Sequence, residues 1–148
     1  MRKLILLFIF LSSFILISAQ SKGFGAGIIV GEPTGISGKY WVSSINSINM
    51  AAAWSFKGDG AILLQADYVF HEYNLIKVNK GKLPVYFGIG GRVFLSDEII
   101  IGARVPIGIS YMFANAPVDI FLEVVPVLNL VPATDFSVDG GIGFRYFF

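Results

Sequence analysis

The sequence contains no cysteine and only one histidine, His71, among its 148 residues. The absence of cysteine excludes disulfides, thiolate chemistry and lipid attachment at a cysteine. A single histidine excludes a metal site built on a histidine cluster. Charged residues are also scarce, at 14% of the chain against 55% hydrophobic residues, so the composition is too apolar for an ordinary soluble surface.

Long hydrophobic runs are missing beyond residue 20. A membrane-spanning helix needs about 20 consecutive apolar residues, and no run in this part of the chain approaches that length. Apolar content without apolar runs is typical of membrane barrels, in which side chains alternate between the lipid and the lumen. Neither sign of charge is in clear excess, because the chain has nine basic and ten acidic residues once Arg2 and Lys3 are set aside. This balance indicates no nucleic-acid partner.

The first nineteen residues have the features of a secretory signal peptide. Arg2 and Lys3 form a charged start, residues 4–17 form an apolar stretch broken only by two serines, and Ser18 and Ala19 are small. A helix of that apolar stretch would be about 21 Å long, which is short for a bilayer. We therefore expect a signal peptide at residues 1–19, cleaved after Ala19 or one residue later, and a single domain at 20–148. A retained N-terminal anchor is the alternative.

The rest of the chain is divided by turn residues into segments in which apolar and polar side chains alternate. This period of two predicts strands with one apolar and one polar face. Turns are indicated at Glu32–Gly35 and Gly58–Gly60, among others. Pro106 and Pro126 lie inside predicted strands and lack the N–H of the ladder, so we expect a bulge or a strand end near each. The eight predicted strands span residues 23–31, 35–43, 48–57, 61–72, 84–93, 99–113, 118–128 and 136–148.

The polar faces indicate which side of these strands faces outward. A soluble lipocalin-like barrel would also alternate, but with its apolar face inward. Here the polar faces are rich in glycine and carry few charges, as suits a narrow eight-stranded interior. The apolar faces hold too many bulky side chains for that interior, and their aromatic residues gather toward strand ends. We therefore predict an all-β fold, an eight-stranded antiparallel up-and-down transmembrane β-barrel.

The last strand, Phe136–Phe148, resembles the C-terminal strand of bacterial outer-membrane β-barrels. Its apolar face includes Phe144, Tyr146 and Phe148. In those proteins the terminal aromatic residue and the alternating apolar residues form the assembly signal. The resemblance implies the same role for these three residues, with the barrel-assembly machinery as a partner during biogenesis.

Four segments together resemble small outer-membrane β-barrel proteins of uncharacterised function: Gly31–Trp41, Trp54–Phe56, Gly88–Arg92 and the closing strand. The size is similar to that of OmpX and of the transmembrane domain of OmpA. The resemblance implies a location in the outer membrane, outer-membrane lipid as surroundings, and no catalytic residues. With both termini in the periplasm, the connections at 31–35, 57–61, 94–99 and 129–136 would be short and face outward. The longest connection, residues 73–83, would face the periplasm.

Eight charged residues on the polar faces are candidate lumen residues, four basic and four acidic, with Lys57 at the rim. A buried charge is costly unless it is paired and hydrogen-bonded, so a balanced set in a narrow lumen predicts a closed, structural charge network. A selectivity filter would need a wider pore. The eight residues are Lys39, Asp67, Arg92, Arg104, Asp119, Glu123, Asp139 and Arg145.

Other polar residues suggest weaker hypotheses. His71 could serve a lipid-modifying enzyme as a general base, but no serine and carboxylate are placed to join it, and a polar residue at the interface is the simpler interpretation. Lys77, Lys80 and Lys82 could meet anionic headgroups or peptidoglycan, or lie in a solvated loop. We expect a structural or interaction role with no channel, enzyme activity, metal or cofactor. The alternative is a barrel that handles lipids or small ligands, either a soluble lipocalin-like carrier or a lipid-modifying barrel.

Overall fold

The computed structural model describes residues 23–55 and 60–148, which form nine β-strands. The predicted signal peptide, residues 1–19, lies outside the described residues, as does Lys57. No helix in the described ranges is long and apolar enough to cross a membrane. The strands are β1 (Phe24–Glu32), β2 (Gly35–Trp41), β3 (Asn46–Ser55), β4 (Ala61–Glu72), β5 (Val85–Leu95), β6 (Ile99–Arg104), β7 (Ile107–Met112), β8 (Val118–Val131) and β9 (Asp135–Phe147).

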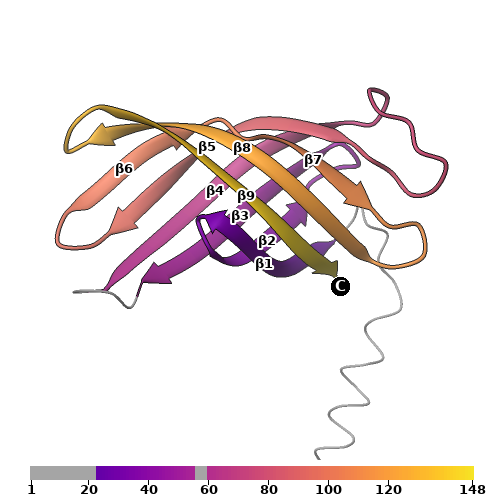
Figure 1. Ribbon diagram of the computed structural model, residues 1–148, viewed down its shortest axis with the longest axis horizontal. Coiled ribbons are helices and arrows are strands. Elements are labelled where there is room, and N and C mark those ends of the chain that lie inside the picture. The colour runs from indigo at the N-terminus through magenta and orange to yellow at the C-terminus, as the bar shows by residue number, and fades with distance from the viewer. Residues whose placement is uncertain (1–22, 56–59) are drawn as a thin grey trace, which may run out of the picture.

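The strands form one closed antiparallel sheet (Figure 1). From β1 to β5 each strand pairs with the next, and β8 pairs with β9. β6 and β7 both lie between β5 and β8. The ring closes where β1 pairs with β9, with Gly25 opposite Phe147 and Glu32 opposite Gly140. Closure pairs the strands that would otherwise be the two edges of the sheet.

The predicted strand 99–113 is divided in two at Pro106, which gives nine strands where eight were predicted. The register against β5 is unchanged across the break, because Arg104 pairs with Gly90 and Ile107 pairs with Phe87. The carbonyl of Pro106 still accepts a hydrogen bond of 3.1 Å from the amide of Gly88, but Pro106 has no N–H to donate one in return. The expected strand end near this proline is therefore present.

Pro126 does not interrupt its strand. It lies within β8, opposite Val138 of β9, and its carbonyl accepts a hydrogen bond of 3.0 Å from the amide of Val105. The shift in register in this region lies between Ile101 and Gly102 of β6, at some distance from the proline. Pro126 has no N–H to donate in return, and the break between β6 and β7 lies opposite this position.

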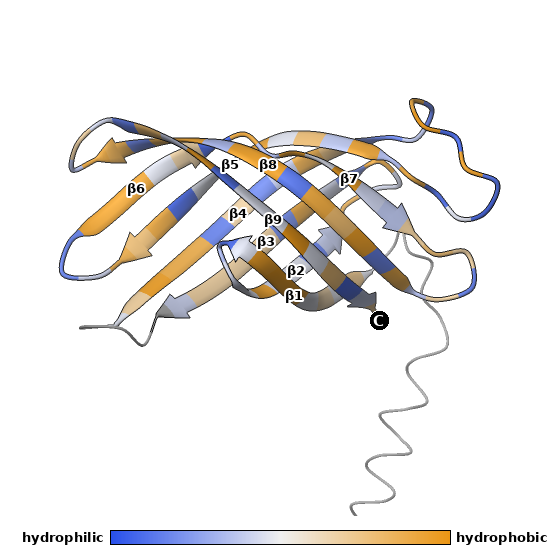
Figure 2. Cartoon of the chain, viewed as in Figure 1, coloured by the Kyte–Doolittle hydropathy of each residue, from blue (hydrophilic) through white to orange (hydrophobic). Residues whose placement is uncertain are grey.

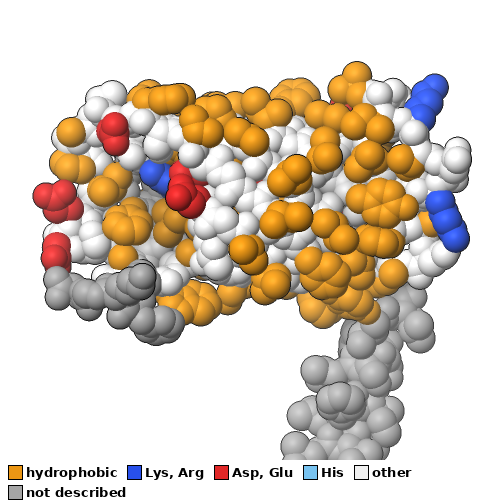
Figure 3. Space-filling view, viewed as in Figure 1, with side chains coloured by type: hydrophobic (Ala, Val, Ile, Leu, Met, Phe, Trp, Pro, Cys, Tyr) orange, Lys and Arg blue, Asp and Glu red, His pale blue; other side chains and the backbone are white. Residues whose placement is uncertain are grey.

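The two faces of the sheet differ in polarity as the alternation predicts. Large apolar side chains such as Ile28, Ile89 and Phe136 are exposed on the outside, whereas Lys39 and Asp119 are fully buried inside. Figure 2 shows the alternating hydropathy along the strands, and Figure 3 shows apolar side chains spread over the face of the wall in view. This arrangement is the reverse of that in a soluble barrel, where the apolar face is inside.

The interior is filled by pairing large side chains with glycine on the neighbouring strand. Tyr86 lies opposite Gly108, and a Cβ atom at Gly108 would lie 2.5 Å from the Tyr86 ring. Phe147 lies opposite Gly25, and a Cβ atom at Gly25 would lie 2.5 Å from the Phe147 ring. Alternating large and small residues is how a narrow barrel accommodates its interior side chains. The glycine-rich polar faces are therefore packing positions.

The end of the barrel away from the termini has an uneven rim. β1 ends at Glu32, opposite Gly140, so the first part of β9, Asp135–Asp139, extends beyond β1. β8 runs equally far, because Asn129 pairs with Asp135. Figure 1 shows the β1–β2 turn ending well short of the other hairpins at the left-hand end. We call the resulting gap in the wall, above Glu32 and beside Asp135–Asp139, the notch.

Candidate functional site

The lumen is closed by apolar side chains at the end that holds the C-terminus. Trp41, Met112 and Phe147 form a buried cluster there, and Tyr73 packs against it. Tyr73 begins the longest connection, residues 73–84, and its hydroxyl donates a hydrogen bond of 2.9 Å to the carbonyl of Ser44. Partial burial raises the pKa of Tyr73 to about 12, so the hydroxyl keeps the proton that it donates. We call these four side chains the floor.

The long connection is held against this end of the barrel. Lys82 exchanges two backbone hydrogen bonds with Met112, of 3.0 and 2.7 Å, and the hydroxyl of Tyr111 donates to the carbonyl of Lys80 at 2.9 Å. The backbone carrying the predicted basic residues is therefore fixed at two of its three lysines. The ammonium of Lys82 also lies 5.5 Å from the centre of the Tyr73 ring.

The first charged layer lies directly above the floor. The carboxylate of Asp119 lies 3.1 Å from Nε of Arg145 and 4.0 Å from Nζ of Lys39. Folding β8 and β9 about a turn near residue 132 predicts that Asp119 lies opposite Arg145 or its neighbour Phe147. In the structure Asp119 pairs with Arg145. The guanidinium of Arg145 lies 3.9 Å from the centre of the Phe121 ring, a cation–π contact.

His71 belongs to this layer and is buried. Its Nδ1 lies 3.0 Å from the carbonyl of Ile45, and its Nε2 lies 2.7 Å from Nζ of Lys39. A carbonyl can only accept, so Nδ1 carries the proton and Nε2 accepts from the ammonium of Lys39. The simpler interpretation from sequence, a polar residue at the membrane interface, is wrong, because both ring nitrogens of His71 are used inside the lumen.

The second layer is centred on Arg104 of β6, whose side-chain partners come from two other strands. Its Nε lies 2.9 Å from Asp67 of β4 and its Nη2 lies 3.6 Å from Glu123 of β8. Nη1 donates to the side-chain carbonyl of Gln65. The other oxygen of Glu123 accepts a hydrogen bond of 2.8 Å from the hydroxyl of Tyr86. A charge-assisted set of this kind stabilises a buried guanidinium that would be costly alone.

The third layer lies nearest the notch and is partly exposed. Nη1 of Arg92 lies 2.7 Å from Asp139, and its Nε and Nη2 donate to the side-chain oxygen of Asn129 at 3.3 and 3.1 Å. The structure thus distributes the eight predicted charges over three layers: Lys39, Asp119 and Arg145; Asp67, Arg104 and Glu123; Arg92 and Asp139. It does not join Arg92 and Asp139 to the deeper residues by any ion pair between described residues.

The deeper layers leave little free volume. A cavity between Gln65, Asp67, Glu123 and Arg145 measures about 10 Å³, which is about the room that one water molecule needs. Four positive and four negative side chains also balance one another in the lumen. This arrangement is a packed, electrically neutral interior.

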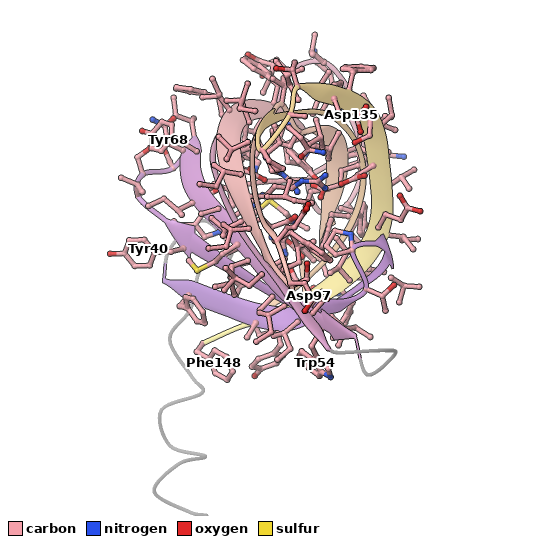
Figure 4. The ribbon with its side chains drawn as sticks, turned by 90° about the vertical axis from the view of Figure 1, so that its left-hand side faces the viewer. Tyr40, Trp54, Tyr68, Asp97, Asp135 and Phe148 are labelled. Atoms are coloured by element: carbon pink, nitrogen blue, oxygen red, sulfur yellow. The ribbon has the colours of Figure 1, made fainter. Side chains whose placement is uncertain are left out.

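Above the third layer the lumen opens into a vestibule of about 490 Å³. Leu63, Phe94 and Ile100 line one side of it, from β4, β5 and β6. Glu32, Asp135, Ser137 and Asp139 lie on the side formed by β1 and β9. Figure 4 looks into this end of the barrel and shows Asp135 and Asp97 at its rim.

The three residues of the predicted assembly signal lie on the outer wall at the C-terminal end. Phe144 and Phe148 are exposed, and the Tyr146 and Phe148 rings meet edge to face with their centres 5.4 Å apart. The amide of Phe148 donates a hydrogen bond of 2.9 Å to the carbonyl of Phe24, which extends the closing pair of strands. Phe147, which lies between Tyr146 and Phe148 in the sequence, points inward and belongs to the floor.

Several lumen residues were missed by considering formal charge alone. His71 shares the inward face of β4 with Asp67, and Tyr86 shares that of β5 with Arg92, so the alternation of each strand identifies them. Asn129 and Ser110 follow the same rule on β8 and β7, and Ser110 lies 3.4 Å from Asp119. Within the described ranges, no group of three His, Asp or Glu side chains is suited to hold a metal ion.

No protein-family model matches this chain, and no curated protein is significantly similar to it in sequence. The fold is similar to the N-terminal β-barrel domain of Pseudomonas aeruginosa OprF, with a TM-score of 0.58 and 15% identity. The similarity covers 84% of this chain and 95% of that domain. At this level of identity the likeness shows the fold alone. The closed sheet is a β-barrel with the fold of that domain.

Proposed function

We propose that this chain is a small outer-membrane β-barrel protein with a structural or interaction role in the bacterial envelope. In this proposal the barrel spans the bilayer with eight strands, β6 and β7 counting as one strand interrupted at Pro106. The signal peptide at 1–19 directs export, and the barrel-assembly machinery recognises Phe144, Tyr146 and Phe148. The barrel acts neither as a channel nor as an enzyme.

The observation that carries this proposal is the polarity of the barrel. Its outer wall is apolar, as contact with lipid requires, and its interior holds paired charges and a closed floor. In a soluble carrier the apolar side chains would face a ligand inside, so this polarity supports the membrane barrel. The filled lumen supports the absence of a channel, because eight strands leave room for side chains but not for an aqueous pore.

A pair of lysine substitutions tests whether lipid surrounds the wall. Ile89 in the middle of β5 is 66% exposed, and Leu75 in the long connection is 68% exposed. A lysine facing the bilayer midplane costs about 2–4 kcal/mol, whereas one in water costs little. We expect Ile89→Lys to reduce the yield of folded protein in the outer membrane strongly, and Leu75→Lys to leave it unchanged. Equal yields for both variants would contradict a lipid-facing wall.

Two further measurements test location and closure. In membrane fractionation we expect the protein to sediment with the outer membrane and to need detergent for its release. In planar bilayers we expect no stable conductance from the pure protein. Release by a high-salt wash would refute the location, and steady ion-selective channels would refute the closed lumen.

A further inference from the structure

We propose that the vestibule is a binding site for a small organic cation that carries an apolar group. The site lies at the notch, above the ion pair of Arg92 and Asp139, and is separate from the packed network below. Its volume of about 490 Å³ lies within the range of small-molecule sites, about 300–1,000 Å³. Which side of the membrane supplies the ligand rests on the proposed function. Binding of the ligand to the vestibule does not depend on that function.

The charge of the site selects a cation. Arg92 is already paired with Asp139 at 2.7 Å, so this ion pair is neutral as a unit. Glu32 and Asp135 add two exposed carboxylates, and no ion pair between described residues involves either of them. The field that the described residues create at the notch is therefore negative, which favours positive ligands and disfavours anions.

The walls of the vestibule select an amphipathic ligand. The apolar side chains of Leu63, Phe94 and Ile100 come from strands on one side, and the carboxylates come from β1 and β9 on the other. A ligand with an ammonium at one end and a hydrocarbon or aromatic group at the other satisfies both sides. Ser137 lines the same space, and its hydroxyl oxygen has no hydrogen-bond partner among the described residues of the structure.

A bare metal ion does not fit this site. The described residues offer no cluster of three side chains suited to metal coordination. The apolar side of the vestibule would also contribute nothing to a hydrated ion. The open volume and the mixed lining instead match an organic molecule, in which apolar contact adds to the charge interaction.

The test uses the full exported chain in nanodiscs of zwitterionic phosphatidylcholine, titrated with 2-phenylethylammonium chloride. Amide shifts in ¹H–¹⁵N spectra report the position of the ligand. We expect saturable shifts at Gly31, Asn129 and Ser137, and none at Met112 in the floor. The neutral analogue 2-phenylethanol should bind at least about tenfold more weakly. Shifts that do not saturate and spread over the outer wall would show partition into the lipid and overturn the proposal.

Matched variants locate the charge. Glu32→Gln combined with Asp135→Asn should weaken binding of the ammonium about tenfold, because two surface carboxylates together contribute on that scale. Glu72→Gln, at the opposite end of the barrel, should leave binding unchanged. Heat-modifiable migration on a semi-native gel confirms that each variant is folded. Equal affinity of the double variant and the wild type would refute the site.

The salt dependence of the wild type gives a measurement that needs no variant. Raising NaCl from about 0.05 to about 0.5 M shortens the Debye length about threefold and should weaken binding of the ammonium but not of the alcohol. The same salt response for both probes would mean that the carboxylates at the notch take no part in binding.

Discussion

The two ends of the lumen are built in opposite ways. At the C-terminal end the floor of Trp41, Met112, Phe147 and Tyr73 is apolar and excludes water, and the charges above it are fully buried. At the notch the lumen is open, its ion pair is partly exposed and its rim is acidic. Both ends contain an ion pair between an arginine and an aspartate. The buried pair of Arg145 and Asp119 belongs to the packed interior, whereas the partly exposed pair of Arg92 and Asp139 forms the base of a cavity.

The largest effect is expected from charge on the outer wall near the floor. Phe148→Asp should block membrane insertion while leaving export intact, because the terminal aromatic residue is the predicted assembly signal. Phe136→Asp is the matched control, an exposed phenylalanine on the same face of β9 at the notch end. Heat-modifiable migration and membrane yield measure both. If the two variants assemble equally well, the C-terminal end has no special role in assembly.

A second, smaller effect concerns the deepest ion pair. Asp119→Ala and Arg145→Ala should each lower the free energy of unfolding by about 3–5 kcal/mol, because each leaves a buried charge without its partner. The double variant should lose less than the sum of the two. Denaturant unfolding in detergent or lipid measures this. Strictly additive losses would mean that the two residues do not act as a pair.

The packing of the interior gives a third prediction. Gly108→Ala should destabilise the barrel by about 1–3 kcal/mol, because its Cβ would lie 2.5 Å from both the Tyr86 ring and the Leu122 carbonyl. At Gly91 the nearest atom to such a Cβ is the Gly102 carbonyl oxygen at 3.5 Å, an ordinary contact. Gly91→Ala is therefore the control and should change stability little. Equal losses at both positions would show that the interior is not filled as described.

The smallest effect is expected at the notch. Arg92→Ala should cost about 1–2 kcal/mol, less than Arg145→Ala, because the Arg92 side chain is 15% exposed and that of Arg145 is 1% exposed. Water can solvate the Asp139 carboxylate once Arg92 is removed. The same unfolding measurement compares the two arginine variants directly. A loss at Arg92 as large as that at Arg145 would remove the distinction between the two ends.

Much of this architecture follows from alternation along each strand. The period of two assigns side chains to the inner or outer face, and folding β8 against β9 places Asp119 opposite Arg145. The contacts of Arg104 were beyond such reasoning, because they depend on the register between strands. Arg104 reaches Asp67 past Gly90 of the intervening strand, and it reaches Glu123 along the neighbouring strand β8. Pattern within one strand cannot show which residues meet across a lumen.

The vestibule was equally hidden in the sequence. It depends on how far each strand extends past its neighbour, and turn residues locate strand ends only to within a few positions. The predicted strand 118–128 in fact continues to Val131, and β9 begins at Asp135, which raises one hairpin above the short β1–β2 turn. The charged rim was visible only as scattered acids in separate turns.

If the barrel spans a bilayer as proposed, the low wall at the β1–β2 turn has a consequence for the lipid around it. β2 has seven residues and β8 has fourteen, whereas a transmembrane strand uses about 9–11. Seven tilted residues span about 18 Å, less than the apolar band of about 25 Å that such barrels present. This hydrophobic mismatch is relieved when the barrel tilts or the bilayer thins on that side. In that proposed setting, lipid headgroups would lie deeper beside the notch than elsewhere around the barrel, and the acidic rim would open sideways onto the polar surface of the membrane.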